Sequence, residues 1–190
     1  GDRATFETLA RRNAEWIRAS GAKRLVTTCA ECYSMLKYEY PNVVGEWPVE
    51  ILHMTQLIEE LVRAGRLKFT KPVDLAVTYQ DPCRLGRHSM EYDAPRAVLK
   101  AIPGVTLVEM DRVRENSMCC GVGAYSNCDA QTKFLQQERL EEAASKANHL
   151  VTACPHCRIH FSCYLDGRPV DPLPELKIVD VTDLAAQALG

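Results

Sequence analysis

The sequence predicts an α/β fold with mainly parallel sheets. Short apolar strands alternate along the chain with segments whose apolar residues recur at helical spacing, a pattern typical of helices packed against a parallel sheet. One strand–helix unit also occurs twice, since Leu-Val-Thr runs into Cys-x-x-Cys at residues 25–32 and again at 150–157. Such an internal repeat indicates that one supersecondary structure has been duplicated.

The first 70 residues are expected to alternate helices with strands. The expected elements are a helix over 4–19, a strand at 25–28, a helix over 33–40, a strand at 49–52 and a helix over 56–64. The second helix is expected to stop at Pro41, because proline interrupts the backbone hydrogen bonds of a helix. Thr55 is the expected N-cap of the third helix, since a threonine side chain can accept a hydrogen bond from the first free amides.

The rest of the chain continues this alternation after a linker at 66–72. The expected strands cover 75–79, 105–110, 149–153 and 176–181, and the expected helices cover 94–101, 129–147 and a last segment from Thr182. No low-complexity tract interrupts them. A length of 190 residues accommodates one large domain or two small ones.

The repeat predicts two domains, of which the first is incomplete. Cys29 and Cys154 differ by 125 positions (154 − 29), so the first-copy counterpart of Cys119 would stand at −6 (119 − 125), before the first residue. We therefore expect residues 1–70 to be the C-terminal part of a first, truncated unit and residues 71–190 to be a complete second unit. A longer chain or a partner would supply the missing half.

The cysteine content favours metal chemistry over disulfides. The chain holds nine cysteines, an odd number, and its first residues lack the apolar core of a signal peptide. Clustered thiols in a reducing compartment more often hold a metal or do redox work than form a disulfide scaffold. The net charge of −2 and a pI near 6.2 exclude a strongly basic surface for nucleic acid. No apolar run reaches the roughly 18 residues of a membrane span. We expect a cytoplasmic protein, either free or attached peripherally to a membrane complex.

Five thiols of the second unit form the candidate metal site. They are Cys83, Cys119, Cys120, Cys154 and Cys157. Each group follows a predicted strand, and the carboxyl ends of parallel strands converge on one crevice, so thiols distant in sequence can meet there. Five sulfurs are one too many for tetrahedral zinc, whereas they suit a multi-iron cluster.

Backbone groups are expected to support this site. Helix N-termini after Cys120 and Cys157 would aim N–H groups at anionic sulfur. Gly121 is a candidate cofactor-binding residue, because glycine lets the backbone approach a cluster closely or adopt a positive φ.

The cysteine set resembles the cysteine-rich CCG domain of the heterodisulfide reductase family, as found in its B- and D-type subunits. Relatives of that family include the iron–sulfur subunits of glycolate, lactate and glycerol-3-phosphate oxidoreductases. The supporting phrases are Asp-Pro-Cys-Arg-Leu-Gly-Arg at 81–87, Ala-Pro-Arg-Ala-Val-Leu at 94–99, Ile-Pro-Gly-Val at 102–105 and Glu-Asn-Ser-Met-Cys-Cys-Gly at 115–121. The resemblance covers nearly all of the chain. Two such domains occur in tandem in the family, so it implies two repeated CCG-type units, the N-terminal one truncated.

The resemblance also implies a cofactor and a function. The cofactor is a [4Fe-4S] cluster, of the noncubane kind in the heterodisulfide reductases, held by the five cysteines. The function is that of an oxidoreductase subunit passing electrons from a flavin- or ferredoxin-type partner to a disulfide or other terminal acceptor, with a small thiol or disulfide as a candidate substrate. Cys29 and Cys32 are additional ligand candidates in the intact protein. The sequence departs from the family pattern at Gln80, where histidine is common, and at 122–125, where Val-Gly-Ala-Tyr replaces a glycine-rich run.

Two other functions remain open from the residues alone. One is a zinc-binding structural domain that scaffolds a larger complex, and the other is a thiol–disulfide protein using Cys29 and Cys32. Cys128 and Cys163 lie outside the motif and are expected to be small buried or half-buried residues. His156 is expected either to donate a hydrogen bond to the cluster or to face solvent.

Overall fold

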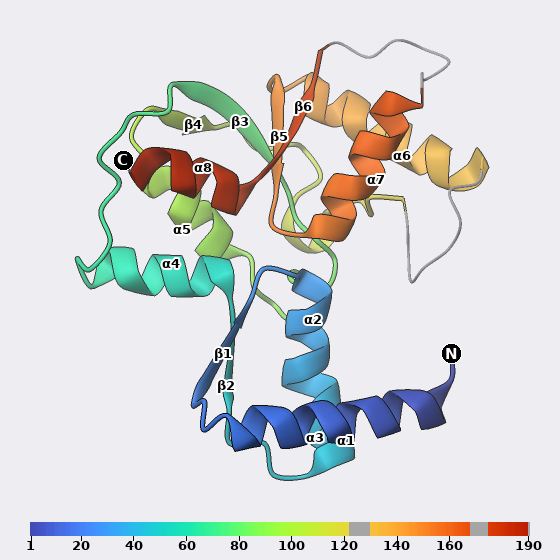
Figure 1. The fold of residues 1–190 in the computed structure, drawn as a ribbon. Helices are drawn as coiled ribbons and strands as arrows, with labels where there is room; N and C mark the ends of the chain where they lie inside the picture. Colours follow the sequence, from blue (N-terminus) through green and yellow to red (C-terminus); the bar gives the residue numbers. More distant parts are fainter. Residues whose placement is uncertain (122–129, 168–174, 190) are drawn as a thin grey trace.

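The computed structural model describes residues 1–121, 130–167 and 175–189 (Figure 1). Its α-helices are α1 (Arg3–Ala19), α2 (Ala30–Ser34), α3 (Tyr40–Val44), α4 (Met54–Arg63), α5 (Asp93–Ala101), α6 (Ala130–Ala144), α7 (Pro155–Asp166) and α8 (Val181–Leu189). Its strands are β1 (Arg24–Thr27), β2 (Glu50–His53), β3 (Leu75–Gln80), β4 (Val105–Leu107), β5 (His149–Thr152) and β6 (Lys177–Asp180). A π-helical turn, η1 (Met35–Glu39), and a 3-10 turn, η2 (Arg114–Asn116), complete these segments.

The larger sheet has the strand order β4-β3-β5-β6, and every pair in it is parallel. Helices α5 and α8 cover one face of this sheet, and α6 and α7 cover the other (Figure 1). This is the layered arrangement that right-handed crossovers produce when strands are added on both sides of a starting strand. The predicted α/β fold with parallel sheets is confirmed.

The smaller sheet repeats the register of part of the larger one. Strands β1 and β2 pair in parallel with Leu25 opposite Ile51, and β5 and β6 pair in parallel with Leu150 opposite Ile178. The offsets between the copies are 125 (150 − 25) and 127 (178 − 51), as they are in the sequence. The duplicated sequence therefore forms the same parallel pair twice, each followed by a helix. The division into two domains at residue 70 stays a prediction.

The expected end of a helix at Pro41 is wrong. The π-helical turn η1 leads directly into α3, and Pro41 lies in the first turn of α3. At that position the missing proline N–H has no helical acceptor to lose, and the fixed φ of proline suits a helix start. The helical path therefore continues to Val44.

The N-cap of α4 is His53 and not Thr55, which lies inside the helix. The His53 ring nitrogen Nδ1 accepts a hydrogen bond from the Thr55 amide at 3.3 Å, and Gln56 Oε1 accepts from the His53 amide at 3.0 Å. Histidine is not among the preferred cap residues, so the sequence pattern placed the N-cap two residues too late, at Thr55.

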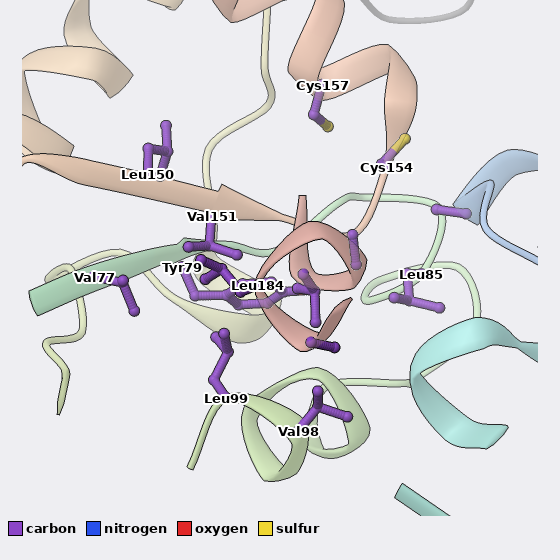
Figure 2. Close-up of a cluster of buried hydrophobic side chains, with 14 of the residues drawn as sticks. Val77, Tyr79, Leu85, Val98, Leu99, Leu150, Val151, Cys154, Cys157 and Leu184 are labelled. Carbon is purple, nitrogen blue, oxygen red and sulfur yellow. The ribbon is translucent and has the colours of Figure 1, made fainter. Parts of the chain in front are cut away.

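The core lies on both faces of β3 and β5. Val77, Tyr79, Leu150 and Val151 on these strands are completely buried, as is Leu99 of α5. Cys154 and Cys157 belong to the same cluster and lie on the first turn of α7, beyond the end of β5 (Figure 2). The hydrophobic effect that buries the sheet thereby also fixes the start of α7.

Candidate metal centre

Two of the predicted site segments leave adjacent strands at the same edge of the sheet. Gln80 at the end of β3 is paired with Thr152 at the end of β5. Cys83 follows three residues after the first of these, and Cys154 follows two residues after the second. Because β4 lies on one side of β3 and β5 on the other, this edge is the topological switch point, where parallel α/β sheets form their crevice.

The third segment reaches the same edge through the long loop after β4. The loop passes through η2 and arrives at the Cys-Cys-Gly turn. The thiols of the three segments then interact in one chain, in the order Cys83, Cys119, Cys120, Cys157, Cys154. The structure thus brings together all five cysteines of the predicted set.

Interactions along this chain divide the thiols into two kinds. Contact with Cys120, and then with Cys83, holds the pKa of Cys119 far below that of an ordinary thiol. Contact with Cys157 lowers the pKa of Cys154 to about 6. The pKa of Cys83 is raised by Cys119, and that of Cys157 by Cys120. Neighbouring thiols therefore compete for negative charge, and all five can ionise together only if a cationic group offsets their repulsion.

The donor set fits an iron–sulfur cluster better than a single metal ion. Among the described residues, no three His, Cys, Asp or Glu side chains surround a common point as a single-ion site requires. The thiols instead follow one another in pairs, and their soft sulfur atoms are the ligands that iron–sulfur clusters take.

Positive charge and helix geometry favour the thiolate form at Cys119 and at Cys154. Arg87 is one of the groups that lower the pKa of Cys119, and its Nη1 is anchored by the Ser117 carbonyl at 2.5 Å. Cys154 is the N-cap of α7, and the nearby amides of Cys157 and His156 also lower its pKa. Helix α7 therefore begins between the two cysteines, rather than after Cys157 as expected. The matching expectation for Cys120 concerns residues 122–129, which lie outside the described residues.

A buried arginine joins the backbones that carry the cysteines. Arg139 of α6 is fully buried, and it donates from Nε to Gln80 Oε1 at 2.6 Å and from Nη2 to Ser117 Oγ at 3.2 Å. Gln80 in turn donates from Nε2 to the Met118 carbonyl at 2.9 Å. Gln80, which departs from the family pattern, therefore ties the end of β3 to the residue before Cys119.

A second buried arginine fixes the loop that carries Cys83. Arg96 of α5 makes two hydrogen bonds to the Asp81 carboxylate, at 2.7 and 2.8 Å, and a third to Glu109 at 2.6 Å. Asp81 also accepts from the Arg114 amide at 2.7 Å, which holds the long loop against the end of β3. The side chains of Arg96 and Asp81 are both nearly inaccessible to water, so the charge of each is stabilised mainly by the other.

The sequence reasoning did not identify Arg139. The signal is present, since the buried residues of α6 include Gln136, Arg139, Leu140 and Ala143, which have the i, i+3, i+4, i+7 spacing of one helix face. An arginine on an otherwise buried face indicates a paired internal charge. The polar residues around that face concealed the pattern.

Gly121 is needed for packing against α6. Its φ is 91°, and a Cβ at this position would lie 2.6 Å from Gln136 Cγ and 2.7 Å from the Thr132 carbonyl oxygen. The positive φ was one of the two reasons expected for a glycine here. Its role as a cofactor-binding residue stays a prediction.

Replacing Gly121 by alanine is expected to lower the free energy of unfolding by about 2–4 kcal/mol, the sum of a left-handed backbone and an overpacked contact. Gly65→Ala is the matched control, because Gly65 has a φ of 68° at the end of α4 but open space around a Cβ. That variant is expected to lose about 1–2 kcal/mol, the backbone cost alone. Urea unfolding of both variants measures the difference, and equal losses would contradict the contact with α6.

The first Cys-x-x-Cys lies beside the second. Cys29 is half-buried, burial and then Cys32 raise its pKa to about 11, and Cys154 is close enough to contribute to that shift. His156 Nδ1 lies 2.8 Å from a carboxylate oxygen of Glu31, so residues inside the two motifs are in direct contact. The first motif thus faces the edge at which the other thiols meet.

Cys163 is not part of this chain of thiols. Cys163 is exposed, so the expectation of a buried or half-buried residue is wrong. The buried face of α7 carries Cys157, Phe161 and Tyr164, which have helical spacing, and Cys163 falls on the opposite face. Cys128 lies outside the described residues.

An apolar cavity of about 580 Å³ opens beside Cys32, and Ile17, Leu25 and Leu36 contribute to its lining. The repeat counterparts of Cys32, Leu25 and Leu36 are Cys157, Leu150 and Phe161, and all three are buried. Strand β3 and the Cys-Cys-Gly turn cover them in the second copy. In the first copy the described residues provide no such cover.

Comparison with known proteins decides the family. Residues 1–37 and 77–162 match the cysteine-rich CCG domain, which is more than half of the chain. The chain belongs to the CCG family. The matched segments include both Cys-x-x-Cys motifs and the Cys-Cys-Gly turn. The family resemblance inferred from the sequence is therefore confirmed.

Named relatives of this CCG protein are oxidoreductases or their subunits, and one of them is named as iron-sulfur-binding. It is 39% identical over 187 residues to the D-type subunit of dihydromethanophenazine:CoB–CoM heterodisulfide reductase from Methanosarcina barkeri, covering 96% of this chain and 44% of the relative. It is 35% identical over 193 residues to the probable iron-sulfur-binding oxidoreductase FadF of Bacillus subtilis, and 32% identical over 200 residues to the EtfAB:quinone oxidoreductase of Syntrophomonas wolfei. Each of these two matches covers 100% of this chain and 27% of the relative. The chain thus spans less than half the length of these relatives.

Proposed function

We propose that this CCG protein is an iron–sulfur redox module of an oxidoreductase, with its cluster held by Cys83, Cys119, Cys120, Cys154 and Cys157. The observation that carries the proposal is the continuous chain of five interacting thiols at the switch point of the sheet. The names of the relatives support the same chemistry. A bound iron–sulfur cluster would supply one-electron transfer at this edge.

The chain's own residues would hold the cluster and set its environment. The lowered pKa values of Cys119 and Cys154 favour the thiolate form that ligation requires. Arg87 and the first amides of α7 would offset negative charge, which favours the more reduced state. Arg96 and Arg139, the two buried arginines, would hold the segments that carry Cys83 and Cys119 in place. A [4Fe-4S] cluster, and its noncubane form, is the cluster type that five thiolates suit.

Cys29 and Cys32 are proposed as ligands of a second site completed by a further Cys-Cys-Gly turn. The matching register of the two copies and the cavity beside Cys32 support this. The turn would come from a longer chain or from a partner subunit.

The partners are proposed to be redox subunits of the flavin or ferredoxin type. The terminal acceptor is proposed to be a disulfide, after the heterodisulfide reductase relatives, with a quinone system as the alternative that another relative's name indicates. No helix among the described residues is long and apolar enough to cross a bilayer.

Anaerobic purification of the full chain tests the proposal. We expect brown protein that contains iron and acid-labile sulfide, with an EPR signal in one of its redox states. Colourless protein with stoichiometric zinc would reject the proposal in favour of a structural scaffold. Protein without metal that instead forms a reversible Cys29–Cys32 disulfide would favour thiol–disulfide chemistry.

A further inference from the structure

His53 lies between the two Cys-x-x-Cys turns. The residue is 1% exposed, and its ring packs edge-on against Tyr33 with the centroids 6.1 Å apart. Its Nε2 atom is 3.2 Å from the carbonyl oxygen of Thr28, the residue before Cys29. The carbonyl of Ala153, the residue before Cys154, also interacts with the ring. One buried side chain therefore contacts the backbone at the start of both turns.

The partners of His53 determine where its proton lies. A carbonyl oxygen only accepts hydrogen bonds, so Nε2 must carry the proton. Nδ1 accepts from the Thr55 amide and so carries the lone pair. Burial lowers the pKa of His53 and keeps the ring neutral, as this pairing requires. The ring thus caps α4 with one nitrogen and donates to the Thr28 carbonyl with the other, while the Ala153 carbonyl lies close enough to affect its pKa.

The repeat explains why a histidine is needed here. The counterpart of His53 is Asp180, 127 positions later (180 − 53), and its carboxylate caps α8 by accepting from the Thr182 amide at 2.8 Å. Aspartate is a better N-cap than histidine, so capping alone would favour aspartate at both positions. A carboxylate, however, has no proton to donate to a carbonyl. Histidine at position 53 adds the donor that the second copy lacks.

We propose that His53 is a positioning residue that ties the backbone before Cys29 to the backbone before Cys154, so that the two Cys-x-x-Cys turns are held as one unit. The contact between Glu31 and His156 joins the same turns at their outer side. The importance of this link for a metal centre rests on the proposed function. The link itself is a property of the polypeptide.

Hydrogen exchange of the full chain, followed by mass spectrometry, tests the proposal without requiring metal. In His53→Asn, the asparagine Oδ1 stands near the position of His53 Nδ1 and keeps a good helix cap, but the donor at the position of Nε2 is lost. We expect amide exchange to become about fivefold faster in the two windows 24–33 and 149–158, the effect of losing one buried hydrogen bond. Amides in the first turn of α4 should retain their protection.

Two further variants control the result. His149→Asn makes the same chemical change at the start of β5, remote from Cys154, and is expected to leave window 24–33 unchanged. His53→Gln returns an amide donor near the position of Nε2 and is expected to restore protection in both windows.

Unchanged exchange in His53→Asn, or a change in only one window, would overturn the proposal. Equal loss in the asparagine and glutamine variants would assign His53 to ring packing against Tyr33 instead. A change spread evenly over all peptides would indicate general destabilisation and would likewise reject it. If His53→Asn shows faster exchange in both windows but the protein binds no iron, the link between the turns stands and the proposed function is rejected. If the protein binds iron but His53→Asn shows no such change, the proposed function stands and the link is rejected.

Discussion

Replacing Cys119 by serine is expected to lower the iron content of anaerobically purified protein by about 10- to 100-fold, since even changes in the outer shell of a metal site cost that much. Cys119 lies between Cys83 and Cys120 in the chain of thiols, and its pKa is lowered further than that of Cys154. Serine has nearly the same shape but offers no soft anionic sulfur. Cys119 is only half-buried, so the fold should survive the substitution.

Iron and sulfide analysis with EPR measures this loss. Cys163→Ser is the matched control, because Cys163 is exposed and lies on the outer face of α7. We expect that control to keep its full iron content and an unaltered EPR signal. An iron content in Cys119→Ser equal to that of the control would remove Cys119 from the ligand set.

Replacing Arg96 by methionine is expected to lower the free energy of unfolding by about 3–5 kcal/mol, the usual cost of leaving a buried charge without its partner. The variant would leave the Asp81 carboxylate, which is 3% exposed, with neither of its guanidinium hydrogen bonds. The loop that carries Cys83 and the Arg114 amide would lose a common anchor. Because the charge is buried, added salt should recover little of the loss.

Urea denaturation followed by circular dichroism measures this change. Arg158→Ala removes one half of a surface ion pair with Asp183, whose side chains are 47% and 46% exposed, and is expected to cost at most about 1 kcal/mol. The double variant Arg96→Met/Asp81→Asn should be less destabilised than the sum of the two single variants, since it leaves no unpaired charge. Additive losses would show that Arg96 and Asp81 stabilise the protein independently.

The sequence predicted the order of the elements well because their signals are local. Strands such as β3 and β5 are short apolar runs bounded by polar residues, and this pattern is legible without tertiary information. The errors fell at element ends, where tertiary contacts override local preference. Pro41 continues a helical path because a π-helical turn precedes it, and His53 replaces Thr55 as a cap because its other nitrogen has a distant partner.

The sequence by itself determined the α/β class, the duplication and the set of cysteines brought to one edge. Each of these depends on composition and spacing, because the residues that follow parallel strands come together at the carboxyl edge of the sheet. Only the tertiary structure decided what holds that edge together. Arg139, Arg96 and His53 bind groups between 15 and 59 positions away in the sequence, through hydrogen bonds that form only inside a packed interior. No local pattern reports such partners, because a buried polar group is satisfied by whatever the fold places beside it.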